Sequence, residues 1–497
     1  MTPSTSAMQC RPLSWARTSV RELFNQERFL STLALMSERT TFDVLIIGAG
    51  QAGIPLAHAL AKVGKRVGLV ERQHLGGSCV NFGCTPTKAV ISSARIAHQA
   101  RRAAEFGLKI STIEVDFQAV LERAKRILTE SRDGLQKDLK DSDNPKLIRG
   151  QARLDGRHGE MFVVRINDEV VTAAQVVLDT GTRSFIPPID GLTEVDFIHS
   201  ENWLERSELP KHLAIIGGGY IGLEMSQFYR RMGSRVTVIE ESNQIASRED
   251  EDVAQALQQL LETDGVEFQL NSKVSRIASV NSRLALTIER SDGPSQLETS
   301  HVFVATGRKP NTDELGLETV SVKLSDRGIV EANERLATNV NGIWVAGDIR
   351  GGPMFTHTSW DDYRVLLSQL AGDGKRTTDR IVPYAIFTDP ELGRVGTTER
   401  EARKARKNIK VGRYEMKKNG KAREQGDTAG FIKVVIDADT DHILGAAVLA
   451  VEGAELVHLY VDLMNAHAPY TVIRDAVHIH PTIAEALQSV LSDISSE

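Results

Sequence analysis

The sequence predicts an α/β protein with two Rossmann-like dinucleotide-binding domains and a C-terminal α+β domain. The chain has 497 residues, which is too long for one hydrophobic core and suits about three or four domains. A strand, a glycine-rich turn, a helix and a second strand ending in an acid occur together twice. From Ile381 onward, strands such as 430–436 and 442–449 alternate with helices such as 452–466. This change of pattern is typical of an α+β domain.

The first of the two units begins with the apolar run 42–47, which is bounded by glycine and predicts a buried parallel strand. The fingerprint GAGQAG (48–53), a helical stretch and a second strand ending at Glu71 follow. The fingerprint glycines allow a tight turn that places a pyrophosphate at the helix N-terminus, and the acid bonds ribose hydroxyls. The candidate nucleotide-binding residues of this unit are therefore Gly48, Gly50, Gly53 and Glu71.

The second unit repeats the same pattern, with a strand at 211–216, the fingerprint GGGYIG (217–222) and a strand at 235–239. Its acid follows the first glycine at the same spacing as in the first unit. Glycines that merely end strands would not reproduce that spacing, so we expect two nucleotide sites in one chain. The candidate residues here are Gly217, Gly219, Gly222 and Glu240.

Two of the three cysteines, Cys79 and Cys84, lie between glycines just after the second strand of the first unit. Such a pair can close a small ring if the helix that starts there is irregular, and a thiolate or a reduced flavin opens an exposed ring readily. We interpret the pair as a redox disulfide. Two structural thiols or half of a metal site are the alternatives, but the sequence has no second Cys/His cluster to supply the missing ligands. We therefore predict no metal site.

Composition excludes several other classes of protein. The net charge of −6 and the pI near 6.2 give no basic field for nucleic acid, so no nucleic-acid role is predicted. The chain lacks an unbroken apolar run of ~18 residues, so we expect no membrane span. Three cysteines cannot build a secreted disulfide framework, which favours a reducing compartment and a cytoplasmic location.

Residues 1–41 form an N-terminal extension, which we expect to be disordered. Its arginines and serines leave a transit peptide open, whereas three glutamates argue against one. We prefer Met36 over Met1 as the natural start, because it leads directly into the first strand. Cys10 would then have no function.

The cysteine stretch LGGSCVNFGCTPTK (75–88) resembles the active-site signature of the class I pyridine nucleotide-disulfide oxidoreductases. These include dihydrolipoamide dehydrogenase, glutathione reductase, mercuric reductase and the reactive-chlorine-resistance flavoproteins, and the resemblance runs from about Phe42 to the C-terminus. It implies two Rossmann-like domains for FAD and NAD and a C-terminal α+β dimerisation domain in a homodimer. We accordingly expect a FAD-binding domain at 42–188 and 311–380, a NAD-binding domain at 189–310, and a dimerisation domain at 381–497.

Chain order in the family assigns FAD to the first fingerprint and the nicotinamide cofactor to the second. A carboxylate at Glu240, followed by Glu241, favours a free 2′-hydroxyl and repels a 2′-phosphate, so NADH is expected over NADPH. Arg248 beyond them could soften that preference. The resemblance adds further cofactor-binding residues, with Asp348 on the ribityl chain and Tyr220 as an aromatic gate over the flavin: Gly77, Thr180, Gly181, Tyr220, Gly307 and Asp348.

The resemblance also implies the catalytic roles. Cys84 corresponds to the flavin-side sulfur and Cys79 to the interchange sulfur, whose proton must be taken by a base. The motif HPTIAE (480–485) supplies His480 as acid/base and Glu485 as the carboxylate that orients it, and in family homodimers the partner subunit offers this dyad. Lys88 near the flavin pairs with Glu224.

We predict that electrons pass from NADH through FAD to the Cys79–Cys84 disulfide, and on to an external disulfide or a soft metal ion, in cell redox homeostasis. His58 stands where glutathione reductases hold an arginine, and the chain ends without the C-terminal cysteine pair of mercuric reductases. The stretch 351–364 looks like the mercuric-reductase-like and chlorine-resistance branch. Dihydrolipoamide dehydrogenase and a non-catalytic NADH-sensing flavoprotein are the alternatives.

Overall fold

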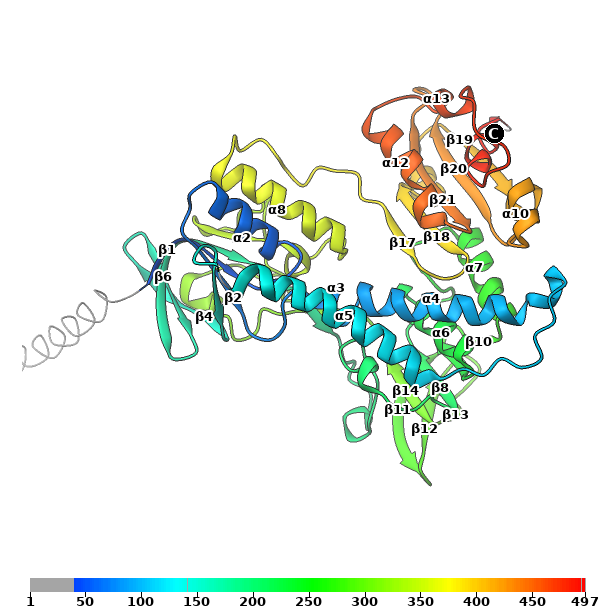
Figure 1. The fold of residues 1–497 in the computed structure, drawn as a ribbon, viewed down its shortest axis with the longest axis horizontal. Helices are drawn as coiled ribbons and strands as arrows, with labels where there is room; N and C mark the ends of the chain where they lie inside the picture. The colour runs from blue at the N-terminus through cyan, green and yellow to red at the C-terminus, as the bar shows by residue number, and fades with distance from the viewer. Residues whose placement is uncertain (1–39, 141, 493, 497) are drawn as a thin grey trace, which may run out of the picture.

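The computed structural model describes residues 40–140, 142–492 and 494–496 (Figure 1). Nearly all of the predicted N-terminal extension, with Cys10 and Met36, lies outside the described residues. The described chain forms three lobes, each built around its own sheet.

The first lobe contains a seven-stranded sheet whose central strands are parallel. At the carboxyl ends of three of them, Ile47 pairs with Val70 on one side and with Leu178 on the other. Leu178 also pairs with Val345, so the turns that follow four strands meet at one edge of the sheet. The strands are β1 (Thr41–Ile47), β2 (Val67–Glu71), β3 (Lys146–Arg149), β4 (Ala152–His158), β5 (Met161–Ile166), β6 (Glu169–Leu178) and β16 (Ile343–Val345).

Helices α2 (Gly53–Lys62) and α8 (Thr356–Ala371) pack together on this sheet, and α4 (Cys84–Arg101) packs against α5 (Phe117–Lys140) (Figure 1). Residues 102–116 separate these two helices. A short 3₁₀ turn (Ala103–Phe106) follows α4 and ends at Gly107, whose φ of +76° is a left-handed conformation that stops a helix.

The second lobe holds a parallel sheet in the order β10-β9-β8-β14, with a three-stranded antiparallel sheet beside it. Strands β8 and β9 coincide with the predicted strands 211–216 and 235–239 to within a residue, because they are short apolar runs ended by glycine or acid. The ribbon of β7 (Thr182–Ser184) and β15 (Arg308–Pro310) joins the second lobe to the first. The elements of the second lobe are β8 (His212–Ile216), α6 (Tyr220–Met232), β9 (Arg235–Ile239), α7 (Glu251–Thr263), β10 (Val266–Gln269), β11 (Lys273–Val280), β12 (Arg283–Glu289), β13 (Ser295–Thr299) and β14 (His301–Val304).

The C-terminal lobe is a six-stranded antiparallel sheet in the order β17-β18-β21-β20-β19-β22, coloured yellow to red in Figure 1. The single helix expected over 452–466 is broken at Val457 into two short helices. The elements are β17 (Tyr384–Ile386), β18 (Glu391–Gly396), α9 (Glu399–Lys404), β19 (Ile409–Glu415), α10 (Gly420–Gln425), β20 (Phe431–Asp437), β21 (Ile443–Ala450), α11 (Gly453–Leu456), α12 (His458–Asn465), α13 (Thr471–Arg474), α14 (Glu485–Ser489) and β22 (Ser495–Ser496).

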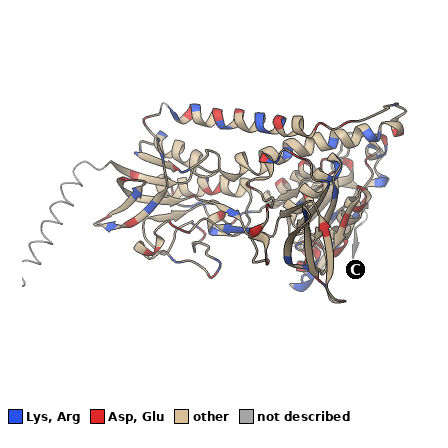
Figure 2. Ribbon diagram, turned by 90° about the horizontal axis from the view of Figure 1, so that it is seen from below, with Lys and Arg blue, Asp and Glu red and all other residues tan. Residues whose placement is uncertain are grey.

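Charges of both signs are interspersed along the described ribbon, so it presents no extended single-sign field (Figure 2). Within the same residues, no helix combines the length and apolarity needed to cross a bilayer.

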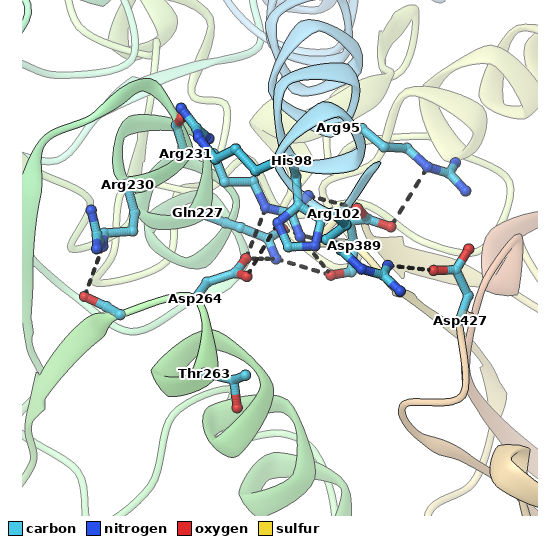
Figure 3. Close-up of polar contacts among 12 residues, drawn as sticks. Arg95, His98, Arg102, Gln227, Arg230, Arg231, Thr263, Asp264, Asp389 and Asp427 are labelled. Carbon is cyan, nitrogen blue, oxygen red and sulfur yellow. Dashed lines mark hydrogen bonds and ion pairs between the residues drawn. The ribbon is translucent and has the colours of Figure 1, made fainter. Parts of the chain in front are cut away.

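The far end of α4 is held where the three lobes meet (Figure 3). The Arg231 guanidinium, 5% exposed, lies 2.8 Å from the Asp264 carboxylate and 2.6 Å from that of Asp389. Arg101 of α4 donates to the backbone carbonyl of Arg231 at 2.7 Å. Arg95 of α4 lies 3.6 Å from the Asp389 carboxylate, so residues of both other lobes hold this helix beyond its start at Cys84.

We expect Arg231→Met to destabilise the protein by about 3 kcal/mol, because it leaves two poorly hydrated carboxylates without their shared cation. The matched control is Arg235→Met, since Arg235 is 59% exposed and its pair with Glu267 is worth less than about 1 kcal/mol. Urea unfolding followed by circular dichroism measures both. Equal losses would contradict the structural role of Arg231.

Candidate active site

One cavity of roughly 700 Å³ lies where the turns after β1, β2, β6 and β16 meet the cysteine stretch. Most of the predicted site residues of the first fingerprint and the redox motif line it, together with two from α6 of the second lobe. These lining residues are Gly48, Gly50, Glu71, Gly77, Cys79, Cys84, Lys88, Thr180, Gly181, Tyr220, Glu224 and Asp348. Gly53, Gly217, Gly219, Gly222, Glu240, Gly307, His480 and Glu485 lie outside its lining.

The first glycine of each fingerprint occupies a position that only glycine fits. Gly48 and Gly217 both have φ of +110°, and a Cβ there would lie 2.2 Å and 2.5 Å from the backbone oxygens of Asp179 and Ala305 respectively. At the last glycine of each fingerprint the space is equally tight. A Cβ on Gly53 would lie 2.2 Å from the backbone oxygen of Gly48, and a Cβ on Gly222 would lie 2.1 Å from that of Gly217. The two turns are therefore built alike, each at the N-terminus of a helix, where a pyrophosphate can bind.

The acid that ends each second strand is held in the same way in both units. Glu71 accepts hydrogen bonds from the backbone N–H groups of Ala49 (3.0 Å) and Gln73 (2.7 Å). Glu240 accepts from those of Gly218 (2.6 Å) and Ser242 (2.8 Å). Each carboxylate is thus fixed beside its glycine turn, where it can bond the ribose hydroxyls of a dinucleotide. The residues present fit two such cofactors.

The predicted irregularity of the helix between the two cysteines is present. Helix α3 (Gly77–Asn81) carries Cys79, and α4 begins at Cys84 after a break at Phe82 and Gly83. Both cysteines are free thiols that hydrogen-bond to each other. The break allows two residues five apart in sequence to face one another on the cavity wall.

The two thiols differ in acidity. The hydrogen bond from Cys79 lowers the pKa of Cys84 to about 6, with help from the Lys88 ammonium and the Thr356 hydroxyl and against partial desolvation. The same hydrogen bond, together with desolvation, raises the pKa of Cys79. Cys84 is therefore a thiolate at neutral pH, while Cys79 keeps its proton until a base removes it.

Lys88 and Glu224 are paired as the sequence predicts, with Nζ 2.8 Å from the carboxylate. Glu224 is buried and also accepts from the backbone N–H of Phe387 at 3.0 Å, while the Lys88 ammonium lies 4.5 Å from the Phe387 ring centroid. Phe387 thus holds both partners. Tyr220, at the start of α6, lies on the cavity wall near Phe355.

His480 and Glu485 form the predicted dyad, with the imidazole Nδ1 2.9 Å from Glu485 Oε1. The backbone N–H of Thr482 donates to the same carboxylate at 2.9 Å, and these bonds lower the pKa of Glu485. His480 is 77% exposed and does not line the cavity of its own chain. Its neighbours Val477 and Ile479 are exposed apolar side chains. The dyad is formed, but outside the cavity that holds Cys79 of the same chain.

Sequence reasoning missed Thr356 and Asp179. Thr356 Oγ1 lies 3.2 Å from Cys84 Sγ, although the two residues are 272 apart in the chain. Asp179 lies directly after β6 and lines the cavity. A signal existed for Thr356, since it follows a glycine-rich turn at a helix start beyond Asp348, but not for its contact with the thiol.

We expect Thr356→Val to raise the pKa of Cys84 by about one pH unit, because it removes a hydrogen bond to the thiolate. In the reduced protein, the fraction of Cys84 that reacts with iodoacetamide near pH 6.5 should fall. Thr356→Ser, which keeps the hydroxyl, should react like the wild type. Equal alkylation profiles for the valine and serine variants would contradict this role of Thr356.

Fold and site together define a disulfide reductase with two dinucleotide sites. Residues 42–362 match the family model described as pyridine nucleotide-disulphide oxidoreductase, and residues 382–491 match that family's dimerisation domain. The chain belongs to the pyridine nucleotide-disulphide oxidoreductase family, whose members use FAD and NAD(P)H. The predicted fold class, enzyme class and pair of cofactor types are thereby confirmed, and the chain carries the dimerisation domain of a homodimer.

Relatives cover nearly the whole chain. It is 34% identical over 456 residues to a protein of Escherichia coli (strain K12) described as "Probable pyridine nucleotide-disulfide oxidoreductase RclA", covering 91% of this chain and 99% of that one. It is 33% identical over 460 residues to the dihydrolipoyl dehydrogenase of Cupriavidus necator, covering 90% and 96%. A solved Cu(II) complex of the HOCl-induced flavoprotein disulfide reductase RclA from Escherichia coli matches with a TM-score of 0.83 at 33% identity, covering 91% and 99%.

Proposed function

We propose that the protein passes electrons from NADH through FAD to the Cys79–Cys84 pair, and from there to an external disulfide or a soft metal ion. The observation that carries this proposal is the pair of unequal thiols on the wall of a cavity that also holds the first fingerprint. When bound, FAD supplies the centre that takes a hydride from the nicotinamide and delivers an electron pair to the disulfide.

The different roles of the Cys79 and Cys84 sulfurs follow from their different acidity. Reduction of the Cys79–Cys84 disulfide takes two electrons and one proton, which leaves Cys84 as a thiolate beside Lys88 and Cys79 as a thiol. His480 then removes the Cys79 proton, and the Cys79 thiolate attacks the acceptor disulfide to form a mixed disulfide. The departing thiolate takes that proton from His480. The Cys84 thiolate then attacks Cys79, which re-forms the Cys79–Cys84 disulfide and releases the second sulfur as a thiolate that takes its proton from solvent.

The His480–Glu485 dyad is proposed to serve the cavity of the partner subunit. The exposure of His480 and its position outside its own cavity support this arrangement. The exposed side chains of Val477 and Ile479 would be covered when a second copy binds. The domain limits 42–188, 189–310, 311–380 and 381–497 and a cytoplasmic location remain predictions.

The preference for NADH rests on Glu240 and Glu241 at the end of β9. Two backbone N–H groups fix the Glu240 carboxylate, so it cannot swing away from a 2′-phosphate without losing both bonds. A phosphate placed there would meet negative charge, whereas a free hydroxyl could donate to it. We therefore propose that NADPH is the poorer substrate.

The acceptor is proposed from chemistry and from one relative's structure. RclA has been solved as a Cu(II) complex. Among residues 40–140 and 142–492 of this chain, no group of three His, Cys, Asp or Glu side chains is arranged to hold a metal. A thiophilic ion would therefore meet the two cysteines themselves, and such an ion is the first acceptor to test beside disulfides.

Steady-state oxidation of NADH by the purified protein tests the proposal, with lipoamide and Cu(II) as alternative acceptors and NADPH in a parallel run. Turnover with lipoamide well above the oxygen background would favour dihydrolipoamide dehydrogenase chemistry, which the Cupriavidus necator relative makes the second candidate. Turnover with Cu(II) alone would favour metal reduction. Failure of NADH to reduce the bound flavin would refute the proposed electron path.

A further inference from the structure

Asp179 is a buried carboxyl between two parts of the cavity wall. It directly follows β6 and is 7% exposed. Its Oδ2 accepts a hydrogen bond from the backbone N–H of Gly53, the first residue of α2, at 2.7 Å. The same oxygen lies 2.9 Å from the point where a Cβ on Gly50 would be, and Oδ1 lies 2.9 Å from the corresponding point on Gly347. The carboxyl therefore touches both the first fingerprint and the Gly347–Asp348 turn.

The charged groups that act most strongly on this carboxyl are other acids. Asp362 faces it from α8, Asp348 from the turn after β16, and Glu71 from the end of β2. Among the described residues, Asp179 has no salt-bridge partner. Arg350 and Arg380 are both held by Asp362, at 3.0 Å and 2.6 Å.

An ionised Asp179 would be costly in this place. A buried carboxylate needs a cation or several hydrogen bonds to offset its lost hydration, and Gly53 alone supplies a bond here. Burial accordingly raises the pKa of Asp179 well above its ordinary value, and the three neighbouring acids add to the effect. The neutral acid keeps the bond from Gly53 without placing a charge beside the helix N-terminus.

We infer that Asp179 is a cofactor-positioning residue that carries a proton when FAD is bound, so that FAD is retained at neutral pH and released as the pH rises. The inference rests on the proposed placement of FAD at the first fingerprint. There the pyrophosphate lies at the N-terminus of α2, whose first N–H group Asp179 engages. A second negative charge at that point would compete with the pyrophosphate and repel it.

The test measures FAD itself and needs no acceptor. Wild-type holoenzyme is equilibrated from about pH 6 to about pH 10, and free flavin is measured by fluorescence after ultrafiltration, with circular dichroism reporting the fold. Above the pH at which Asp179 ionises, the FAD dissociation constant should rise by about tenfold per pH unit. Asp179→Asn keeps an oxygen for the Gly53 N–H but cannot ionise, so its profile should be flat. Asp155→Asn, at an exposed acid of β4, is the matched control and should follow the wild type.

A wild-type profile that is flat over this range would overturn the inference without any variant. Loss of FAD from Asp179→Asn at about pH 6 would also overturn it, because the ionised acid would then be the required form. If the asparagine variant does not fold, Asp179→Ala, which cannot ionise either, must show weaker but pH-independent binding. A purified protein that holds no FAD at any pH would refute the proposed function as well as the inference.

Discussion

Cys79→Ser is expected to lower acceptor reduction by on the order of a thousandfold while leaving reduction of the bound flavin by NADH nearly unchanged. The serine hydroxyl cannot form a mixed disulfide, so electrons reach the flavin but have no exit to the acceptor. Stopped-flow reduction followed at the flavin absorbance separates this half-reaction from steady-state turnover. The Cys84→Ser variant should also lose turnover, because the mixed disulfide on Cys79 could not be resolved.

The third cysteine supplies a control for this experiment. Cys10→Ser removes a thiol that the sequence places outside the redox stretch, and it should behave as the wild type in both measurements. Full turnover by Cys79→Ser would refute the disulfide relay. It would favour instead a flavoprotein that binds NADH without using its cysteines.

The cross-subunit dyad predicts complementation between two inactive proteins. Cys79→Ser homodimers and His480→Ala homodimers each lack one essential group at every site. In a mixed dimer, one site has both mutations and the other has intact Cys79 with intact His480 from the partner subunit. Random mixing should therefore restore about a quarter of the wild-type activity, since half of the dimers are mixed and each has one working site.

The matched control is a mixture of Cys79→Ser with Cys84→Ser. Both changes lie in the same cavity of the same chain, so no mixed dimer has an intact site, and activity should stay at the level of the parents. The absence of recovery in the first mixture, with mixed dimers demonstrated by differently tagged chains, would mean that His480 acts within its own chain.

The two dinucleotide folds were predictable because their signals are local. At Gly48 and Gly217 a left-handed backbone and a close carbonyl leave no room for a side chain, so only glycine fits and its presence in the sequence predicts the turn. Glu71 and Glu240 each lie at the end of the second strand of their unit and accept a hydrogen bond from the glycine turn that follows the first strand. The equal spacing between turn and acid in the two units predicts this contact. The break of the expected helix 452–466 at Val457 was missed, because Val457 itself keeps helical backbone angles, with φ of −59° and ψ of −21°, and its residue type gives no signal.

By itself, the sequence determined the order of the domains, the two nucleotide turns and the position of the cysteine pair, because each of these depends on residues that are close together in the chain. The contact of Thr356 with Cys84, the support of Glu224 by Phe387 and the burial of Asp179 among acids were decided only by the tertiary structure. These groups come from segments that meet where the carboxyl ends of parallel strands share one edge of a sheet. Spacing along the chain carries no record of which side chains meet at that edge.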